Sequence, residues 1–194
     1  MPLHFPELFG DPVPFYWQGT YHVFYLSPRQ PDHEWRHIAT RDFLRWDAYP
    51  TAISPGTEPD APDRDGCWTG SIFEDNGRFH LFYTGFRTDR PDSQVICHAT
   101  STDLIRWTKD PANPILRSDG QVYDLSDWRD PHVMRYGDGY GMFITARLRE
   151  GLELRRGAVA LASSPDLQTW TLQPPFWSNG ITYSPECVDI FEWR

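Results

Sequence analysis

Two short sequence elements recur along this chain at a common spacing of about 60 residues, and this repeat restricts the fold more than any other feature. The first element is an aromatic run with a central phenylalanine, found at Phe24, Phe82 and Phe143. The second is a polar segment that ends in a tryptophan, found at Trp46, Trp107 and Trp170. Separations of 58 and 61 residues for the first element and 61 and 63 for the second indicate one repeating unit.

Turn signals divide each unit into short strands. Each aromatic run follows a dipeptide typical of a tight hairpin, namely Gln18-Gly19, Asn76-Gly77 and Asp138-Gly139. Each tryptophan follows a Ser/Thr-x-Asp turn, and sustained helical periodicity is nearly absent. Each unit therefore predicts a four-stranded antiparallel sheet. The units are predicted at residues 11–66, 67–127 and 128–184, with a fourth beginning near residue 185 and a strand over residues 188–193.

One such sheet cannot bury both of its faces, and radial packing of several sheets around an axis solves this problem. The repeat therefore predicts an all-β fold of the β-propeller type, to which this chain contributes about three blades and the start of a fourth. The competing repeat architecture is a linear β-solenoid, whose units are usually much shorter. No domain boundary is visible, so residues 1–194 are predicted to form a single partial propeller domain.

Carboxylates occur where the innermost strand of a blade begins, a position that a merely packed channel would fill with small or apolar residues. Counted from the hairpin glycines, Asp11, Ser71 and Asp130 occupy nearly equivalent positions, and Glu186 begins the next unit. The repeat thus directs three carboxylates toward one end of one channel. Glycoside hydrolysis needs such a pair, one carboxyl that donates a proton and one that is ionised. Arg129 is expected to lower the pKa of Asp130.

Each of these residues also has an ordinary structural explanation. Asp-Pro commonly initiates a turn, and a single glutamate is commonly a solvated surface charge. The functional reading depends on all three carboxylates sharing one phase of the repeat. His22 and His80 share another phase, as do His37 and His98, which predicts structural residues that hydrogen-bond within the blades.

Other kinds of site lack support in the sequence. Three cysteines, Cys67, Cys97 and Cys187, fit neither a zinc pattern nor a disulfide framework. No metal-ligand spacing, phosphate-binding glycine loop or serine-nucleophile elbow is found, so we expect neither a metal nor a cofactor.

Charge and hydropathy exclude two classes of partner. Lys plus Arg number 18 and Asp plus Glu 27, which gives a net charge of −9. An acidic surface repels nucleic acid and anionic lipid. No apolar run is long enough to span a bilayer, and the first ten residues lack the features of a secretory signal. These features predict a cytoplasmic protein that acts on a small carbohydrate.

With these residues in view, the chain resembles glycoside hydrolase family 32, the invertase, levanase and inulinase-like β-fructosidases. The motifs that carry the resemblance are Gly10-Asp11-Pro12, Trp35-Arg36-His37, Trp68-Thr69-Gly70-Ser71, Arg129-Asp130-Pro131 and Glu186-Cys187-Val188-Asp189. The resemblance implies a five-bladed propeller and a retaining mechanism. It implies that Asp11 is the nucleophile, Asp130 the transition-state stabiliser and Glu186 the general acid/base. It also implies a sugar subsite shaped by Trp35, Trp68, Ser71 and Arg129.

Three departures from the family pattern keep other readings open. Gly10 replaces an asparagine and Leu26 a glutamine, and both changes remove polar contacts to the sugar. The chain is also too short for five blades, which predicts a fragment or self-association that covers the open propeller edge. The alternatives are a family 43-like inverting arabinofuranosidase or xylosidase, and a degenerate propeller that binds carbohydrate without cleaving it.

Overall fold

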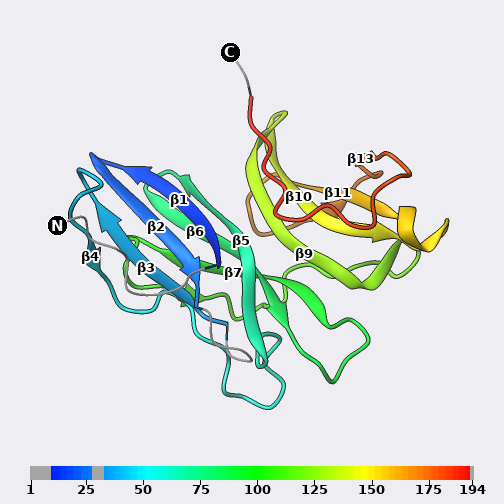
Figure 1. The fold of residues 1–194 in the computed structure, drawn as a ribbon, viewed down its shortest axis with the longest axis horizontal. Helices are drawn as coiled ribbons and strands as arrows, with labels where there is room; N and C mark the ends of the chain where they lie inside the picture. Colours follow the sequence, from blue (N-terminus) through cyan, green and yellow to red (C-terminus); the bar gives the residue numbers. More distant parts are fainter. Residues whose placement is uncertain (1–9, 28–32, 193–194) are drawn as a thin grey trace.

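The computed structural model describes residues 10–27 and 33–192, which form three antiparallel sheets with four principal strands each (Figure 1). Sheet 1 comprises β1 (Gly10–Trp17), β2 (Thr20–Leu26), β3 (Trp35–Thr40) and β4 (Asp47–Ala48). Sheet 2 comprises β5 (Gly66–Asp75), β6 (Arg78–Phe86), β7 (Gln94–Ser101) and β8 (Thr108–Lys109). Sheet 3 comprises β9 (Tyr123–Tyr136), β10 (Gly139–Leu148), β11 (Gly157–Ser164) and β12 (Thr171–Leu172). The short β13 (Trp177–Ser178) pairs with β11, and the 3-10 turn η1 (Glu153–Arg155) connects β10 to β11.

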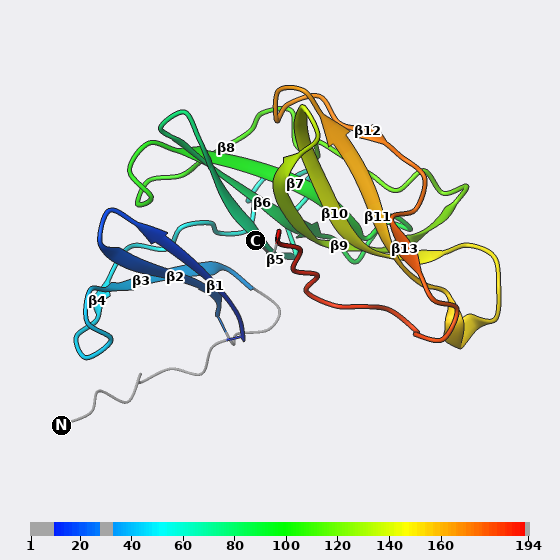
Figure 2. The same ribbon diagram turned by 90° about the horizontal axis from the view of Figure 1, so that it is seen from above.

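The sheets lie side by side in an arc, as the view from above shows (Figure 2). The strands follow one another in chain order within each sheet, from the innermost strand to the short outermost strand. β5 contacts both β1 and β9, so the three innermost strands are neighbours. This arrangement confirms the prediction of an all-β fold of propeller type, with three blades present.

The first hairpin of each blade turns through two residues. Gln18-Gly19 and Asn76-Gly77 both have positive φ at both positions, as the sequence predicted. The third turn is shifted by one residue from the prediction. Tyr136 pairs with Gly139, so the turn residues are Gly137 and Asp138, and Gly137 has positive φ. Glycine at the first turn position suits the alternative two-residue hairpin turn, which displaces the third hairpin glycine from the phase of the others.

The Ser/Thr-x-Asp turns behave alike in all three blades. In blade 2, the backbone N–H of Asp103 donates to the Ser101 hydroxyl, and the Asp103 carboxylate accepts the backbone N–H groups of Ile105 and Arg106. In blades 2 and 3, the tryptophan after the turn reaches the preceding blade. Trp107 packs edge-to-face on Phe24 at a centroid distance of 5.9 Å, and Trp170 packs on Phe82 at 5.7 Å. The repeat therefore encodes the contact between blades as well as the blade itself.

The histidines that share a repeat phase are paired inside the blades. His22 contacts His37 at 2.9 Å between ring nitrogens, and His80 contacts His98 at 3.0 Å. Burial lowers the pKa of His37 to about 3 and, with the neighbouring His98, that of His80 to about 4. These contacts confirm the prediction that the histidines hydrogen-bond within their blades.

The segment that follows blade 3 differs from the prediction. Residues 188–192 form no strand, and Trp193 lies outside the described residues. Instead, Val188 and Ile190 pack against the apolar face of blade 3, on Phe143 and its neighbours. The apolar alternation that predicts a strand here is satisfied by packing, without a hydrogen-bonded partner strand. Over the described residues, no helix is long and apolar enough to cross a membrane.

Candidate functional site

Each innermost strand carries a bulge at the same position of the repeat. In the three strands, register with the neighbouring strand shifts around Asp11, Thr69 and Asp130. Each of these residues lies 13 positions before the central phenylalanine of its blade, namely Phe24, Phe82 and Phe143. Asp11 and Asp130 both have positive φ, at 44° and 54°, and both precede a proline. A bulge turns the strand locally, so it directs these side chains away from the regular alternation.

The strand register shows that Ser71, contrary to the sequence prediction, is not the blade 2 equivalent of Asp11 and Asp130. The blade 2 counterpart of Asp11 and Asp130 is Thr69, and Ser71 lies two residues further along β5, opposite Phe82. Ser71 is buried, and its hydroxyl accepts the backbone N–H of Val133 at 3.0 Å. It therefore joins β5 to β9 along the channel. The count from the hairpin glycines missed this because it accepted separations of six to nine residues as nearly equivalent, whereas the separation of eight found for Asp11 gives Thr69 in blade 2.

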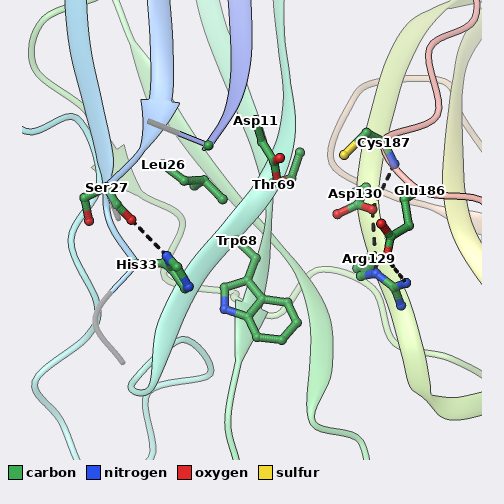
Figure 3. Close-up of a pocket in the computed structure, with 11 residues that line it drawn as sticks. Asp11, Leu26, Ser27, His33, Trp68, Thr69, Arg129, Asp130, Glu186 and Cys187 are labelled. Atoms are coloured by element: carbon green, nitrogen blue, oxygen red, sulfur yellow. Dashed lines mark hydrogen bonds and ion pairs between the residues drawn. The ribbon is translucent and has the colours of Figure 1, made fainter. Parts of the chain in front are cut away.

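One cleft of about 450 Å³ collects most of the predicted site residues (Figure 3). It is lined by Gly10, Asp11, Leu26, Ser27, His33, Trp68, Thr69, Arg129, Asp130, Glu186 and Cys187. In the view of Figure 3, Asp130, Arg129 and Glu186 lie on one wall, facing Asp11 and Thr69. A cleft of this volume is within the range that holds a small ligand. The three predicted carboxylates thus share one opening.

Asp130 is buried and hydrogen-bonded through both its side chain and its backbone. Its side chain is 7% exposed, and its Oδ2 accepts the backbone N–H of Cys187 at 3.1 Å. Its own N–H donates to the hydroxyl of Thr84 at 2.9 Å, and that hydroxyl donates to the carbonyl of Thr69 at 3.0 Å. One buried hydroxyl therefore connects the bulges of blades 2 and 3.

The pKa of Asp130 is raised, whereas the neighbouring Arg129 had led us to predict a lowered pKa. Burial is the main cause, and the charge of Asp11 adds to it. The Cys187 N–H and the Arg129 guanidinium, whose Nε lies 3.7 Å from Asp130 Oδ2, oppose the rise without cancelling it. Arg129 does act to lower this pKa, as expected, but the net shift is upward because burial of the carboxyl outweighs the guanidinium.

Asp11 and Glu186 are more open to solvent. Asp11 is exposed, and it accepts a short hydrogen bond from the hydroxyl of Thr69. The side chain of Glu186 is 72% exposed, and its Oε1 lies 3.1 Å from Nη2 of Arg129. Burial and the neighbouring carboxylates raise the pKa of Cys187 to about 12, so at neutral pH this residue is a thiol with little nucleophilic character.

The two predicted tryptophans have different positions. Trp68 lines the cleft and stacks on Phe86 at a centroid distance of 4.0 Å. Trp35 is 1% exposed and does not line the cleft. Its indole N–H donates to the carbonyl of Trp68 at 3.0 Å. Trp35 therefore supports Trp68 from the adjacent blade, and its part in shaping a sugar subsite stays a prediction.

Several residues that surround the cleft were not predicted. Thr69 contacts Asp11, and counting from the central phenylalanine would have found it. His33 lines the cleft, with its Nδ1 3.0 Å from the carbonyl oxygen of Ser27. Gln94 accepts the backbone N–H of Trp128 and lies 3.4 Å from Nη1 of Arg129. No sequence signal indicated His33 or Gln94, since both reach the site through loops and strand ends. In the described residues, no group of three His, Cys, Asp or Glu side chains is arranged to hold a metal.

The chain is similar in sequence and in fold to proteins of known function. The family model for the glycosyl hydrolases family 32 N-terminal domain matches residues 7–194. The sucrose-6-phosphate hydrolase of Zymomonas mobilis is 33% identical, over 91% of this chain and 36% of its own length. The fructan 1-exohydrolase IIa structure from Cichorium intybus has a TM-score of 0.78 and 25% identity, covering 95% of this chain and 35% of that one.

A further structure is a variant of the GH32 beta-fructofuranosidase of Bombyx mori in complex with sucrose. It has a TM-score of 0.75 and 27% identity, over 95% of this chain and 39% of that chain. The 194 residues therefore span between about a third and two fifths of the length of these proteins. The three sheets correspond to three blades of the five-bladed propeller that such neighbours form.

Proposed function

Since this chain belongs to glycosyl hydrolase family 32, we propose that it supplies the catalytic cleft of a retaining hydrolase of β-fructofuranosides. Asp11 acts as the nucleophile, Glu186 as the general acid/base, and Asp130 as the residue that stabilises the transition state. Trp68 and Arg129 shape the sugar subsite. The observation that carries the proposal is the single cleft that Asp11, Asp130 and Glu186 share.

The proposed reaction proceeds in two displacements. The Asp11 carboxylate attacks the anomeric carbon while Glu186 donates its proton to the leaving glycosidic oxygen. The result is a fructosyl ester on Asp11 and a free alcohol. Glu186, now ionised, removes a proton from water, which attacks the same carbon and releases fructose and the Asp11 carboxylate. The exposure of Asp11 and Glu186 suits groups that must reach substrate and water.

Asp130 is suited to a binding role by its surroundings. Its Oδ2 accepts the Cys187 N–H, and a carboxylate has further acceptor capacity for a sugar hydroxyl. The buried position gives such a bond a low local dielectric, in which it is stronger than in water. Gly10 and Leu26 present no polar side chain to the cleft. Polar recognition of the sugar therefore falls mainly to Asp130, Arg129 and His33.

The test measures sugar release from sucrose, a short fructan and an aryl arabinofuranoside, using the full-length protein that contains this chain. Asp11→Ala and Glu186→Ala serve as the matched inactive variants. Fructose release that both variants abolish supports the proposal. Arabinose release alone would favour an inverting, family 43-like enzyme. A folded protein that binds fructoside and releases no sugar would indicate a non-catalytic carbohydrate-binding propeller.

Self-association and cytoplasmic location are the remaining parts of the proposal. Blade 1 exposes an aromatic cluster in which Tyr21 contacts both Tyr16 and Phe43. These side chains are 38–58% exposed. If the 194 residues act alone, light scattering should show an oligomer that covers this face. A monomeric chain at micromolar concentration would contradict the self-association.

A further inference from the structure

We propose that Arg147 is a positioning residue that holds Glu186, and the segment carrying it, in place for acid/base catalysis. This inference rests on the proposed function of Glu186. Arg147 lies near the end of β10, outside the cleft lining, and is 4% exposed. A buried guanidinium must be paired, so its partners indicate what it stabilises.

Arg147 directly contacts the segment that precedes Glu186. Its Nη1 donates to the hydroxyl of Tyr183 at 2.8 Å, and its guanidinium carbon lies 3.9 Å from the centre of the Tyr183 ring. The Arg147 Nη2 donates to the carbonyl of Glu153 at 2.7 Å, which fixes the guanidinium from the opposite side. Tyr183 precedes Glu186 by three residues. A cation–π contact combined with a hydrogen bond to the same ring limits both its position and its orientation.

Arg147 also reaches the Glu186 carboxylate through a chain of alternating charges. Its Nη1 lies 3.3 Å from Asp127 Oδ2, and Asp127 Oδ1 lies 2.8 Å from Nη1 of Arg129. Arg129 Nη2 then donates to Glu186 Oε1 at 3.1 Å. Asp127 and Arg129 are largely buried, with side chains 17% and 12% exposed. The carboxylate of Asp127 thus couples the two guanidinium groups, and only the last member of the chain faces solvent.

The absence of a side chain at Gly157 allows residues 182–184 to lie close to the backbone of blade 3. The N–H of Gly157 donates to the carbonyl of Thr182 at 2.8 Å. A Cβ added at Gly157 would lie 2.6 Å from the Thr182 hydroxyl and 3.1 Å from the Ser184 Cα. The Ser184 hydroxyl lies 3.3 Å from Arg129 Nη2. Residues 182–184 are therefore held from two sides before the chain reaches Glu186.

If Arg147 positions Glu186, its loss should affect the chemical step in a way that a general loss of folded protein would not. Glu186 lies outside regular secondary structure and is 72% exposed, so its local sequence does not fix its orientation. A misplaced general acid slows departure of an alkoxide, which needs a proton, and leaves departure of fluoride nearly unaffected. Loss of Arg147 should therefore harm sucrose cleavage selectively. A general loss of folding would reduce turnover of both substrates in parallel.

The experiment compares kcat/KM on sucrose with kcat/KM on β-fructofuranosyl fluoride in the full-length protein, for Arg147→Met, Tyr183→Phe and Arg156→Met, because kcat/KM reports formation of the fructosyl ester and excludes its hydrolysis, in which Glu186 also acts. Arg156 is the matched control. It is a part-buried arginine of the same blade that pairs with Asp124 at 3.1 Å and donates to the carbonyls of Leu148 and Arg149 rather than to the segment before Glu186. Thermal melting confirms that each variant is folded at the assay temperature.

We expect Arg147→Met to lower kcat/KM on sucrose by about 10- to 100-fold, part of the gain that a positioned acid supplies, and to change kcat/KM on the fluoride by less than about threefold. Tyr183→Phe should show the same selectivity with a smaller loss, and Arg156→Met should show no selectivity. Equal losses on both substrates, or equal selectivity in Arg156→Met, would overturn the role of Arg147 while leaving the proposed function intact. A folded wild-type protein inactive on both substrates would contradict the proposed function and this role together.

Discussion

Asp11 and Asp130 occupy the same position in two repeats, yet the fold gives them different surroundings. Both lie at a bulge of an innermost strand, both have positive φ, and both precede a proline. Asp11 is exposed and contacts the hydroxyl of Thr69, whereas Asp130 is 7% exposed and accepts a backbone N–H from the segment after blade 3. The repeat determines the position of each carboxyl, and the neighbouring residues determine its exposure and its hydrogen-bond partners.

This difference indicates how a repeated scaffold produces distinct chemical roles. A carboxylate in contact with solvent stays available to attack a substrate atom. A buried carboxylate with a raised pKa is better suited to hold a hydroxyl in a fixed geometry. In blade 2, the same position carries Thr69, which supports Asp11 and adds no charge to the cleft. Three equivalent positions thus have three different surroundings, and substitutions at each should separate their proposed roles.

The largest expected effect is on Asp11. Asp11→Asn should lower kcat on sucrose by about 10⁴-fold or more, because it removes the proposed nucleophile. Its melting temperature should stay within about 1 °C of the wild type, since a surface substitution changes stability little. Steady-state kinetics and calorimetry on the same preparation check both parts. Near-normal turnover by Asp11→Asn would exclude this residue as the nucleophile.

Asp130→Asn should lower kcat by a smaller factor, about 10²- to 10³-fold, the range typical of lost transition-state stabilisation. The amide oxygen can still accept the Cys187 N–H, so the variant should remain folded. A loss as great as that of Asp11→Asn, measured under the same conditions, would mean that the two residues act as one unit.

The pH dependence of stability should separate the two aspartates further. The pKa of Asp130 is raised by burial, so the folded state binds this proton more tightly than the unfolded state. Wild-type stability contributed by this group is complete below pH about 4, the ordinary pKa of aspartate, and falls as pH rises through the higher folded value. Denaturant titrations should therefore show Asp130→Asn gaining stability relative to wild type across that window. A relative loss would show that Asp130 is stabilised as the carboxylate.

Thr69→Val should lower kcat about tenfold, because the exposed nucleophile loses the hydroxyl that orients it, a hydrogen bond worth about 1–2 kcal/mol. Thr69→Ser retains the hydroxyl and is the matched control. The comparison uses kcat and KM on sucrose. Equal activity in the valine and serine variants would show that blade 2 contributes only packing here.

Ser71→Ala should show the smallest effect on catalysis and a clear effect on folding. Loss of its hydroxyl leaves the buried N–H of Val133 without its partner, which should cost about 1–3 kcal/mol of unfolding free energy. Denaturant unfolding and the KM for sucrose are the two measurements. A raised KM with unchanged stability would restore Ser71 to the sugar subsite and contradict the register that assigns this phase to Thr69.

The sequence was sufficient to predict the blades and most of the cleft, because hairpin turns, aromatic runs and tryptophan anchors are local signals. A bulge has no such local signal. It places two residues of one strand opposite one residue of its partner, and the sequence of the bulged strand alone does not reveal this. Ser71 lies six residues before its hairpin glycine and Asp11 lies eight before its own, so the approximate count passed over the true equivalent, Thr69. The distance to the central phenylalanine avoids this error, because it is 13 residues in all three blades.

Properties that depend on distant packing could not be predicted from sequence. The raised pKa of Asp130 depends on burial in the folded chain, and it is opposed by a hydrogen bond from Cys187, which lies 57 residues further along the chain. The burial of Trp35 depends on the neighbouring blade, whose Trp68 carbonyl accepts its N–H. The chain from Arg147 to Glu186 crosses strand ends and an irregular segment, for which periodicity carries no information.

The stereochemistry of fructosyl transfer tests the central claim most directly. NMR of the product formed from sucrose in water containing methanol, with the full-length protein, identifies the anomer of methyl fructofuranoside at its first appearance. Double displacement through Asp11 predicts the β-anomer, with retention, and no product from Asp11→Asn. The α-anomer as first product would show a single displacement, in which Asp11 is not a nucleophile, and would contradict the account.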